Sequence, residues 1–561
     1  MAQTNLGWWT DAVVYQIYPR SFCDGNGDGI GDIAGMISKL PYLADLGVDA
    51  LWISPWYPSP MADGGYDVSD YCGIHPDFGT LADADAFIAG AHERGIKVLI
   101  DLVPNHTSSA HPWFGAALMS APGSPERARY HFLDGKGPGG DLPPTNWGCL
   151  FGGSAWTRIT EADGRPGQWY LHMFDVSQPD LNWTNPDVVE MFDDVLRFWF
   201  DRGIDGFRID VADSLHKDMT YPDTKPGPNG LGDVMPASDH PMWDQPALAD
   251  VQRRWRAIAD SYPGGRVFVS EANCPERLAF LRPDRLHTTF TFDSVFCAWD
   301  AASQRHMIDH NLRIHDEVGA GTTWVMGNHD QTRPVTRYGK RITGWPVPES
   351  GVTPMEERVW AEFLFPWPTD VETGRRRARA LVLLYLALPG GMYVYQGEEL
   401  GLEEVEDLPM DRLQDPSFAR TNGRTRGRDG CRVPLPWSGT VPPFGFSPRP
   451  DAEPWLPQPA HWAALTAEAE TGDPASTLEL YRAALRLRHD HPALGAGAMA
   501  WDDRYPRETV VAITRETGFG CVVNIGTDAV ALPAGARVLV ASGPVGDNGL
   551  VPAETAVWYE V

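Results

Sequence analysis

Acidic and other polar side chains follow several short apolar segments of this sequence, where they could carry out acid–base chemistry. They are Asp101 within the segment 97–103, Asn105 and His106 after it, Arg208 and Asp210 within 205–211, Glu271 at the end of 266–272, and Asn328, His329 and Asp330 at the end of 322–330. One such residue is most often structural, but four segments that end in this way indicate a shared site. Two carboxylates at one site can cleave a glycosidic bond, one as nucleophile and the other as acid and base.

Asp210 and Glu271 are the pair that we predict for this chemistry. In a retaining glycosidase the two carboxyl groups lie about 5–5.5 Å apart. Arg208 lies two residues before Asp210, so in a strand both side chains point to the same face. Its positive charge would keep Asp210 ionised, as a nucleophile must be. Partial burial would favour the protonated form of Glu271, as an acid requires.

Three further residues could hold the sugar. Asp330 could bind sugar hydroxyl groups and distort the ring. His106 and His329 are neutral or cationic hydrogen-bond partners for hydroxyls, although histidines with a purely structural role are the alternative. Each of these residues follows an apolar segment, which places it with the carboxylate pair if the segments are neighbouring strands.

Eight apolar segments could position these residues. They are 12–19, 50–55, 97–103, 205–211, 266–272, 288–294, 322–330 and 391–400. Apolar strands without alternation are buried on both faces, which is typical of a parallel sheet. Amphipathic segments at 37–47, 81–95, 186–203 and 477–490 are predicted helices. Eight strand–helix units predict an α/β protein with a TIM (β/α)8 barrel, in which reactive groups sit at the strand ends.

Two segments interrupt or follow the barrel pattern. A stretch rich in Gly and Pro follows the third strand, and a structureless loop of that length is implausible. We therefore predict barrel at 1–105 and 182–494, an inserted domain at 106–181, and a small antiparallel β domain at 495–561. The apolar run at 380–395 is broken by Pro389 and predicts a buried helix followed by a strand rather than a membrane span.

Charge and cysteine content exclude several classes of partner. The 561 residues carry a formal net charge of −29, which argues against binding to nucleic acid or to an anionic membrane. Seven cysteines are scattered without a C-x-x-C pair, so we expect neither a zinc site nor a disulfide scaffold. The N-terminal residues show no signal peptide. We therefore expect a cytoplasmic enzyme, and the sequence leaves its oligomeric state open.

Seven motifs in order resemble glycoside hydrolase family 13, the α-amylase family. They are "GVDALWISPWYPSP" (47–60), "DLVPNH" (101–106), "QPDLNW" (178–183), "GFRIDVA" (206–212), "FVSEA" (268–272), "MGNHD" (326–330) and "GMYVYQGEELG" (391–401). The resemblance implies a (β/α)8 barrel, a domain inserted after the third strand and a C-terminal β domain. It also implies a retaining mechanism, with Asp210 as nucleophile, Glu271 as acid and base, and Asp330 as transition-state stabiliser.

Within that family, "QPDLN", "MADGGYD" (61–67) and "GRDGCRVPLPW" (427–437) resemble the α-glucosidase and oligo-1,6-glucosidase branch. The branch implies that Asp63 and Arg432 grip the non-reducing glucose and close the pocket, so that one glucose is released at a time. An Arg–carboxylate pair at a pocket floor would stop a longer chain from threading through. Tyr66 would stack on the sugar, and Phe151 and Phe174 would form walls, with core packing as the alternative for both Phe.

The linkage and the acceptor stay open. Val211 follows Asp210, and a Val at this position resembles the relatives that prefer α-1,6 linkages. The strings "DVADSL" and "GCRVPLPW" depart from the pattern of those relatives. We therefore favour maltose-type substrates. The alternatives are a transferase or isomerase of the same branch, such as a sucrose isomerase or trehalose synthase, and a non-catalytic binding module. Transfer and hydrolysis would differ in loops at about 215–245 and 331–370. The module is disfavoured because the three carboxylates are present.

The string "DGNGDGIGD" (24–32) begins like an EF-hand loop. Gly35 occupies the twelfth position, where an EF-hand needs Glu, and the preceding segment is strand-like, so a calcium sensor is not expected. The resemblance implies a structural Ca²⁺ or Mg²⁺ in this loop. Its oxygen ligands would come from Asp24, Asn26, Asp28, the Ile30 carbonyl and Asp32, and an unoccupied polar turn is the alternative.

Overall fold

The computed structural model describes residues 7–227, 230–232, 234, 240–272, 277–344, 367–546 and 549–561. At its centre, eight parallel strands form one sheet in the order β10–β11–β1–β2–β3–β7–β8–β9. Their bounds are β1 (Val13–Ile17), β2 (Ala50–Ile53), β3 (Lys97–Leu102), β7 (Gly206–Ile209), β8 (Val267–Ser270), β9 (Thr288–Thr289), β10 (Thr323–Val325) and β11 (Gly391–Tyr395). The sheet is that of a TIM barrel, as the sequence predicts.

The two outer strands of the sheet meet at a side-chain contact. The Thr323 hydroxyl of β10 donates to the Thr289 carbonyl of β9. All eight predicted strands are present, but the segment 288–294 is a strand only over its first two residues. Phe292–Phe296 forms the helix α9 instead. The Ser294 hydroxyl donates there to the carbonyls of Thr291 and Val325, which holds the turn of α9 against β10.

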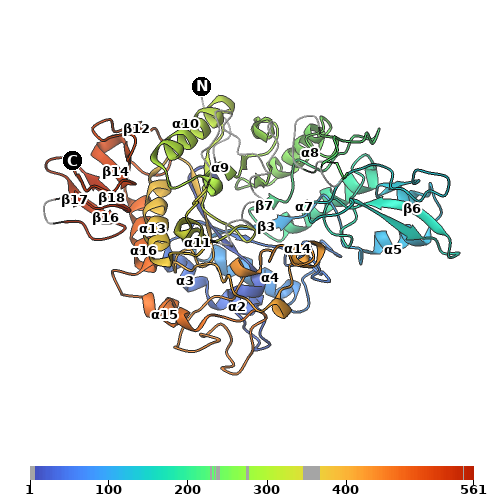
Figure 1. Cartoon of the computed structure of the whole chain (residues 1–561), viewed down its shortest axis with the longest axis horizontal. Coiled ribbons are helices and arrows are strands. Elements are labelled where there is room, and N and C mark those ends of the chain that lie inside the picture. Colours follow the sequence, from blue (N-terminus) through green and yellow to red (C-terminus); the bar gives the residue numbers. More distant parts are fainter. Residues whose placement is uncertain are drawn as a thin grey trace.

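Helices surround the barrel (Figure 1). They are α2 (Ile33–Ser38), α3 (Leu40–Leu46), α4 (Leu81–His92), α7 (Pro186–Asp201), α8 (Leu248–Asp260), α10 (Ala301–Val318), α11 (Pro334–Gly339), α13 (Val371–Ala387) and α16 (Thr477–Asp490). Their ends follow local chemistry. Thr80 and Asp83 form a capping box at the start of α4, and Asn185 followed by Pro186 starts α7. The predicted helices at 81–95, 186–203 and 477–490 are confirmed within three residues.

The chain between β3 and α7 leaves the barrel and forms an antiparallel sheet of its own (Figure 1). The sheet has the order β4–β6–β5, with β4 (Phe132–Leu133), β5 (Trp156–Thr160) and β6 (Pro166–Leu171), and it is preceded by α5 (Pro112–Met119) and α6 (Pro125–Ala128). We call residues 106–181 the inserted segment.

The C-terminal residues form a five-stranded antiparallel sheet in the order β12–β13–β14–β18–β16. Its strands are β12 (Ala500–Trp501), β13 (Val510–Thr514), β14 (Phe519–Asn524), β16 (Arg537–Ala541) and β18 (Thr555–Glu560), beside the pair β15 (Val530–Ala531) and β17 (Leu550–Val551). The sheet lies beside α13 (Figure 1), and the Trp558 indole of β18 donates to the Leu383 carbonyl of α13. This packing buries the apolar residues 380–388 at the end of α13. The strand β11 follows this helix, as predicted.

Much of the aromatic content is core. Ten tryptophans are among the fully buried side chains, namely Trp52, Trp56, Trp147, Trp183, Trp199, Trp243, Trp255, Trp324, Trp462 and Trp558. Within the described part of the chain, no helix has the length and apolar character that crossing a bilayer would require. The six cysteines that the structure describes are all free.

Candidate active site

The carboxyl ends of the parallel strands bring the predicted carboxylates to one rim. Asp101 lies at the end of β3 and pairs in register with Arg208 of β7. Asp210 and Glu271 directly follow β7 and β8, and Asp330 follows β10. Since all strands of the sheet run in the same direction, these residues lie at the same end of the barrel.

Arg208 joins three of these carboxylates. Its Nη1 lies 2.8 Å from Asp101 Oδ1 and 2.7 Å from Asp210 Oδ1, and its Nη2 lies 2.5 Å from Glu271 Oε2. Glu271 Oε2 also lies 3.4 Å from the backbone nitrogen of Val211. Asp210 and Glu271 therefore share one buried guanidinium, which brings the two carboxylates together.

The charge balance of this cluster favours bound protons. Burial raises the pKa of Asp210 well above its ordinary value. Arg208 opposes the shift, and the charges of Glu271, Asp101 and Asp330 add to it. Burial likewise raises the pKa of Asp101 to about 6 against the effect of Arg208. Arg208 thus acts on the pKa of Asp210 in the expected direction, but burial and the neighbouring carboxylates outweigh it, because one cation faces three carboxylates.

Asp330 has the opposite environment. Its Oδ1 lies 3.0 Å from Arg428 Nη1 and 2.8 Å from Arg432 Nη2, and its Oδ2 lies 3.3 Å from His329 Nε2. Burial by itself would raise the pKa of Asp330, but the charges of Arg428 and Arg432 outweigh it and hold this pKa well below its usual range. Asp330 is therefore a carboxylate anion beside the Arg208 cluster.

The arginine that binds Asp63 is Arg428, which differs from the expectation of Arg432. Arg428 Nη2 lies 2.6 Å from Asp63 Oδ1, whereas Arg432 binds Asp330 and donates from Nε to the His329 carbonyl at 2.8 Å. The two arginines are four residues apart around the short 3-10 helix η5 (Asp429–Cys431), so they reach different carboxylates. Sequence reasoning missed Arg428, although it stands in the same "GRDGCR" motif.

Two more residues complete this part of the site and were not predicted. Gln178, the first residue of "QPDLN", donates from Nε2 to Asp63 Oδ2 at 3.0 Å. Asp415 is buried and binds the Nε of Arg428. The position of Gln178 within a quoted motif was an available signal, whereas Asp415 lies in no motif.

The two predicted histidines are both buried and neutral. His106 Nε2 lies 3.1 Å from the Tyr66 carbonyl and 3.1 Å from Gln178 Nε2, and burial lowers its pKa to about 4. His329 lies parallel to the Tyr66 ring, with centroids 5.2 Å apart, and burial lowers its pKa well below the ordinary value. The Tyr66 hydroxyl donates to Asp101 Oδ2 at 3.0 Å, so Tyr66 belongs to the same network.

Phe151 and Phe174 place the inserted segment against the rim. Their ring centroids lie 5.7 Å apart, and the Phe174 ring lies 5.2 Å from that of His106. The Arg428 guanidinium lies over the Phe151 ring at 5.2 Å. Both rings are partly buried and pack against a core cluster of this region, on the side of Arg428 and His106, and we call the pair the aromatic wall.

The glycine-rich loop at 24–32 forms a series of tight turns after β1. Asp24 accepts hydrogen bonds from the backbone nitrogens of Gly27 and Gly29 at 2.6 and 2.8 Å. Asp32 caps α2 by accepting from Gly35 N. The donor set is all oxygen, which suits Ca²⁺ or Mg²⁺. Among the described residues, however, no three His, Cys, Asp or Glu side chains converge as metal ligands.

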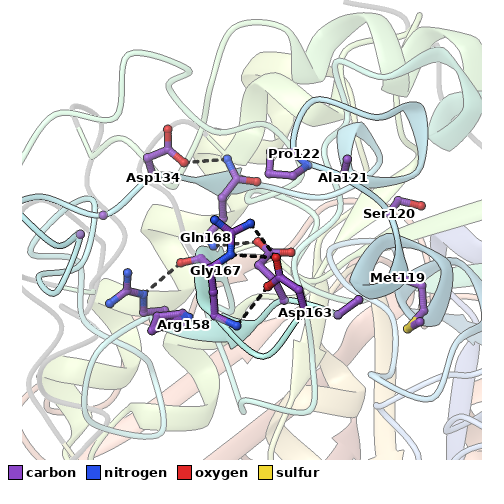
Figure 2. Close-up of a pocket in the computed structure, with 15 residues that line it drawn as sticks. Met119, Ser120, Ala121, Pro122, Asp134, Arg158, Asp163, Gly167 and Gln168 are labelled. Carbon is purple, nitrogen blue, oxygen red and sulfur yellow. Dashed lines mark hydrogen bonds and ion pairs between the residues drawn. The ribbon is translucent and has the colours of Figure 1, made fainter.

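A cavity of about 680 Å³ lies elsewhere, in the inserted segment (Figure 2). Its wall comes from the end of α5, the end of β4 and the hairpin of β5 and β6. Figure 2 shows its charged side chains paired within the wall, for example Gln168 Nε2 with Asp134 Oδ1 at 3.0 Å and Arg158 Nε with the Gly167 carbonyl at 3.0 Å. It contains none of the barrel carboxylates, so we place the reaction at the strand ends.

Parts of both predicted acceptor loops fall outside the described residues. These parts are 228–229, 233, 235–239 and 345–366. The described remainder places Lys217 in a buried ion pair with Asp180 at 3.2 Å, which ties the loop after β7 to the "QPDLN" motif.

Comparison with known proteins gives a consistent result. Residues 16–347 and 364–497 match the family model described as α-amylase, catalytic domain. A probable α-glucosidase of Rhizobium meliloti (strain 1021) is 36% identical over 550 residues, which cover 94% of this chain and 91% of that protein. An oligo-1,6-glucosidase of Heyndrickxia coagulans is 34% identical over 87% of this chain and 86% of that protein. The crystal structure of an α-glucosyl transfer enzyme matches with a TM-score of 0.81 at 35% identity and covers 99% of both chains.

Proposed function

The chain belongs to the α-amylase family of glycoside hydrolases, and from this premise we propose that it is a retaining α-glucosidase that releases glucose from the non-reducing end of short, maltose-type α-glucosides. The observation that carries the proposal is the bridge from Arg428 to both Asp63 and Asp330, beside the carboxylates that Arg208 holds. The similarity to proteins named α-glucosidase and oligo-1,6-glucosidase supports it.

The proposed reaction uses Asp210 and Glu271 in two steps. Asp210 attacks the anomeric carbon while Glu271 donates a proton to the glycosidic oxygen, so that the C–O bond breaks and a glucosyl ester forms on Asp210. Glu271 then removes a proton from water, which attacks the same carbon and releases glucose with its original anomeric configuration. Since the two carboxyls share Arg208, a proton held by this pair can reside on Glu271 and leave Asp210 anionic when the substrate binds.

The exo action follows from the pocket floor. Arg428 ties Asp63, from the loop after β2, to Asp330, after β10, through one nitrogen to each carboxylate, and these contacts close the site beyond one sugar ring. The anionic Asp330 would accept hydrogen bonds from sugar hydroxyls that strengthen as positive charge develops on the ring. Neutral His106 and His329 would serve as hydrogen-bond partners without adding positive charge there.

A panel of maltose, isomaltose, sucrose and trehalose tests this function. We expect glucose as a product of maltose. With p-nitrophenyl α-glucoside, whose leaving group contributes no glucose, the glucose should appear first as the α anomer when the reaction is followed by NMR. Release of the β anomer would contradict a retaining mechanism, and products that contain no free glucose would contradict hydrolysis. The ratio of maltose to isomaltose cleavage gives the linkage preference.

A second candidate is glucosyl transfer or isomerisation. The matching structure of an α-glucosyl transfer enzyme favours it, since a sugar can replace water as the acceptor in the second step. Isomeric disaccharides formed from sucrose or maltose, in place of free glucose, would identify this activity.

We also propose a structural Ca²⁺ in the loop at 24–32, and a cytoplasmic location. The oxygen donors of Asp24, Asn26, Asp28, Ile30 and Asp32 support the cation. The cation would stabilise the turn between β1 and α2 and take no part in bond cleavage.

The free state of the six described cysteines supports a reducing compartment.

A further inference from the structure

A short helix links the pocket floor to the inserted segment. It is α14 (Pro416–Arg420), which follows β11 in the chain. Its N-cap, Asp415, binds Arg428, and Arg428 reaches Asp63 and lies over the Phe151 ring. The N-terminal end of α14 is thus connected to the floor of the proposed glucose site.

The other end of α14 contacts the inserted segment through Arg420. Arg420 Nη2 donates to the Gly152 carbonyl at 3.1 Å and lies 3.5 Å from Cys149 Sγ, and its Nη1 lies 3.5 Å from Asp175 Oδ2. Gly152 directly follows Phe151 in the chain, and Asp175 directly follows Phe174. One guanidinium therefore binds the chain neighbours of both wall aromatics.

A third contact strengthens this arrangement. The Cys149 thiol donates to the Phe174 carbonyl, so the turn that carries Phe151 and the segment after β6 that carries Phe174 are joined at this point. The Arg420 side chain is 20% exposed and that of Asp175 is 13% exposed. Both lie at a partly buried junction, where an ion pair is screened less than on the open surface.

From these contacts we propose that Arg420 is a positioning residue that fixes the aromatic wall of Phe151 and Phe174 against the barrel and so sets substrate affinity. It rests on the proposed glucosidase function, since the wall is taken to face the sugar. Arg420 contacts the chain neighbours of the two rings and would act on the substrate through them. Its loss would let the wall move away from Arg428 without altering the carboxylates at Arg208.

Kinetics of Arg420→Ala test the effect on affinity. We expect the KM for maltose to rise about 5- to 10-fold while kcat stays within about 3-fold, the pattern for lost binding that is equal in ground and transition states. Arg420→Lys keeps the charge but cannot contact Gly152, Cys149 and Asp175 together. Its KM should therefore lie between that of the wild type and that of Arg420→Ala. Arg424→Ala is the matched control, because Arg424 is exposed and its Nε donates only to the nearby Thr421 carbonyl among the recorded contacts.

Hydrogen exchange tests the positioning without any substrate. Peptides that cover 148–154 and 171–178 should exchange faster in Arg420→Ala and not in Arg424→Ala. Asp175→Asn breaks the same ion pair by changing the acid instead of the arginine. It should give the same faster exchange with Arg420 in place, which guards against misfolding of Arg420→Ala. Unchanged exchange and unchanged KM in both variants would overturn the proposal.

The two readouts separate this inference from the proposed function. If the wild-type protein hydrolyses maltose but the exchange rates of the two peptides are the same with and without Arg420, only the positioning role fails. If the exchange responds but no α-glucoside is cleaved, the glucosidase function fails and the link to substrate affinity fails with it.

Discussion

Arg428 Nη2 lies 2.6 Å from Asp63 Oδ1, although the two residues are 365 positions apart in the chain. The contact joins the loop after β2 to the loop after β11, on nearly opposite parts of the sequence. Arg428 also binds Asp330 and Asp415, so one guanidinium is shared by three carboxylates. In the proposed function this bridge forms the floor of the glucose site, so its disruption has measurable consequences.

Removal of Arg428 should impair glucose release strongly. Arg428→Ala leaves Asp63 and Asp415 as buried carboxylates without their cation, and we expect kcat/KM for maltose to fall about 100-fold or more. Arg428→Lys keeps the positive charge but cannot bridge three partners. Its kcat/KM should therefore fall slightly less than that of Arg428→Ala. Arg424→Ala serves as the control, and a variant Arg428→Ala with activity within threefold of wild type would refute the bridge.

Asp210 should be indispensable. Asp210→Asn removes the nucleophile but retains the size of the side chain, and we expect kcat to fall by about 10⁴ or more. Asp218→Asn is a matched control outside the Arg208 cluster, since an Asn there can still accept from Thr220 N as Asp218 does. Circular dichroism checks that both variants fold. Normal glucose release by Asp210→Asn would show that another residue acts as nucleophile.

The stability of the protein should fall in mild acid because of buried neutral histidines. Burial lowers the pKa of His111 to about 4, whereas an unfolded His titrates near 6.5. The unfolded state therefore binds more protons between pH 6.5 and 4, so the contribution of His111 is fully present above about 6.5 and is lost as the pH falls through 4. The contribution is about 3 kcal/mol for a shift of this size.

His111→Asn isolates this effect. His111 caps α5 by accepting from Trp113 N, and Asn is a favoured N-cap that can make the same bond. We expect the variant to lose less stability than the wild type between pH 6.5 and 4 in urea unfolding. Parallel curves for the two proteins over this window would contradict a depressed pKa at His111.

Calcium should raise the melting temperature through the loop at 24–32. A ligand that binds only the folded state stabilises it by an amount that grows with the logarithm of its concentration above Kd, so we expect a rise of several degrees in Ca²⁺ relative to EDTA. Asp28→Ala should abolish the difference and leave the melting temperature in EDTA nearly unchanged. Asp28 is exposed, and its side chain accepts only from Ile30 N among the recorded bonds. Equal melting temperatures in Ca²⁺ and EDTA for the wild type would argue against the site.

The barrel could be predicted from the sequence because its information is local. Each strand is a short apolar segment, and the polar residue that follows it needs only the rule that parallel strands share one end. The placement of Asp101, Arg208, Asp210 and Glu271 in one cluster follows from this rule. β9 is the exception and shows the limit of prediction from local sequence. The residues after Thr289 form the helix α9, which is fixed by a contact to β10.

The sequence by itself thus determined the fold class, the rim of carboxylates and the family. Only the tertiary structure decided which arginine binds Asp63, which charge state the buried carboxylates favour, and how Arg420 holds the aromatic wall. The physical reason is distance along the chain. Arg428 and Arg432 stand in one motif, and the turn between them, packed against Asp415 and Asp330, selects their partners. The pKa of Asp210 likewise depends on burial and on three carboxylates from other strands, and only the effect of Arg208, two residues away, is visible in the local sequence.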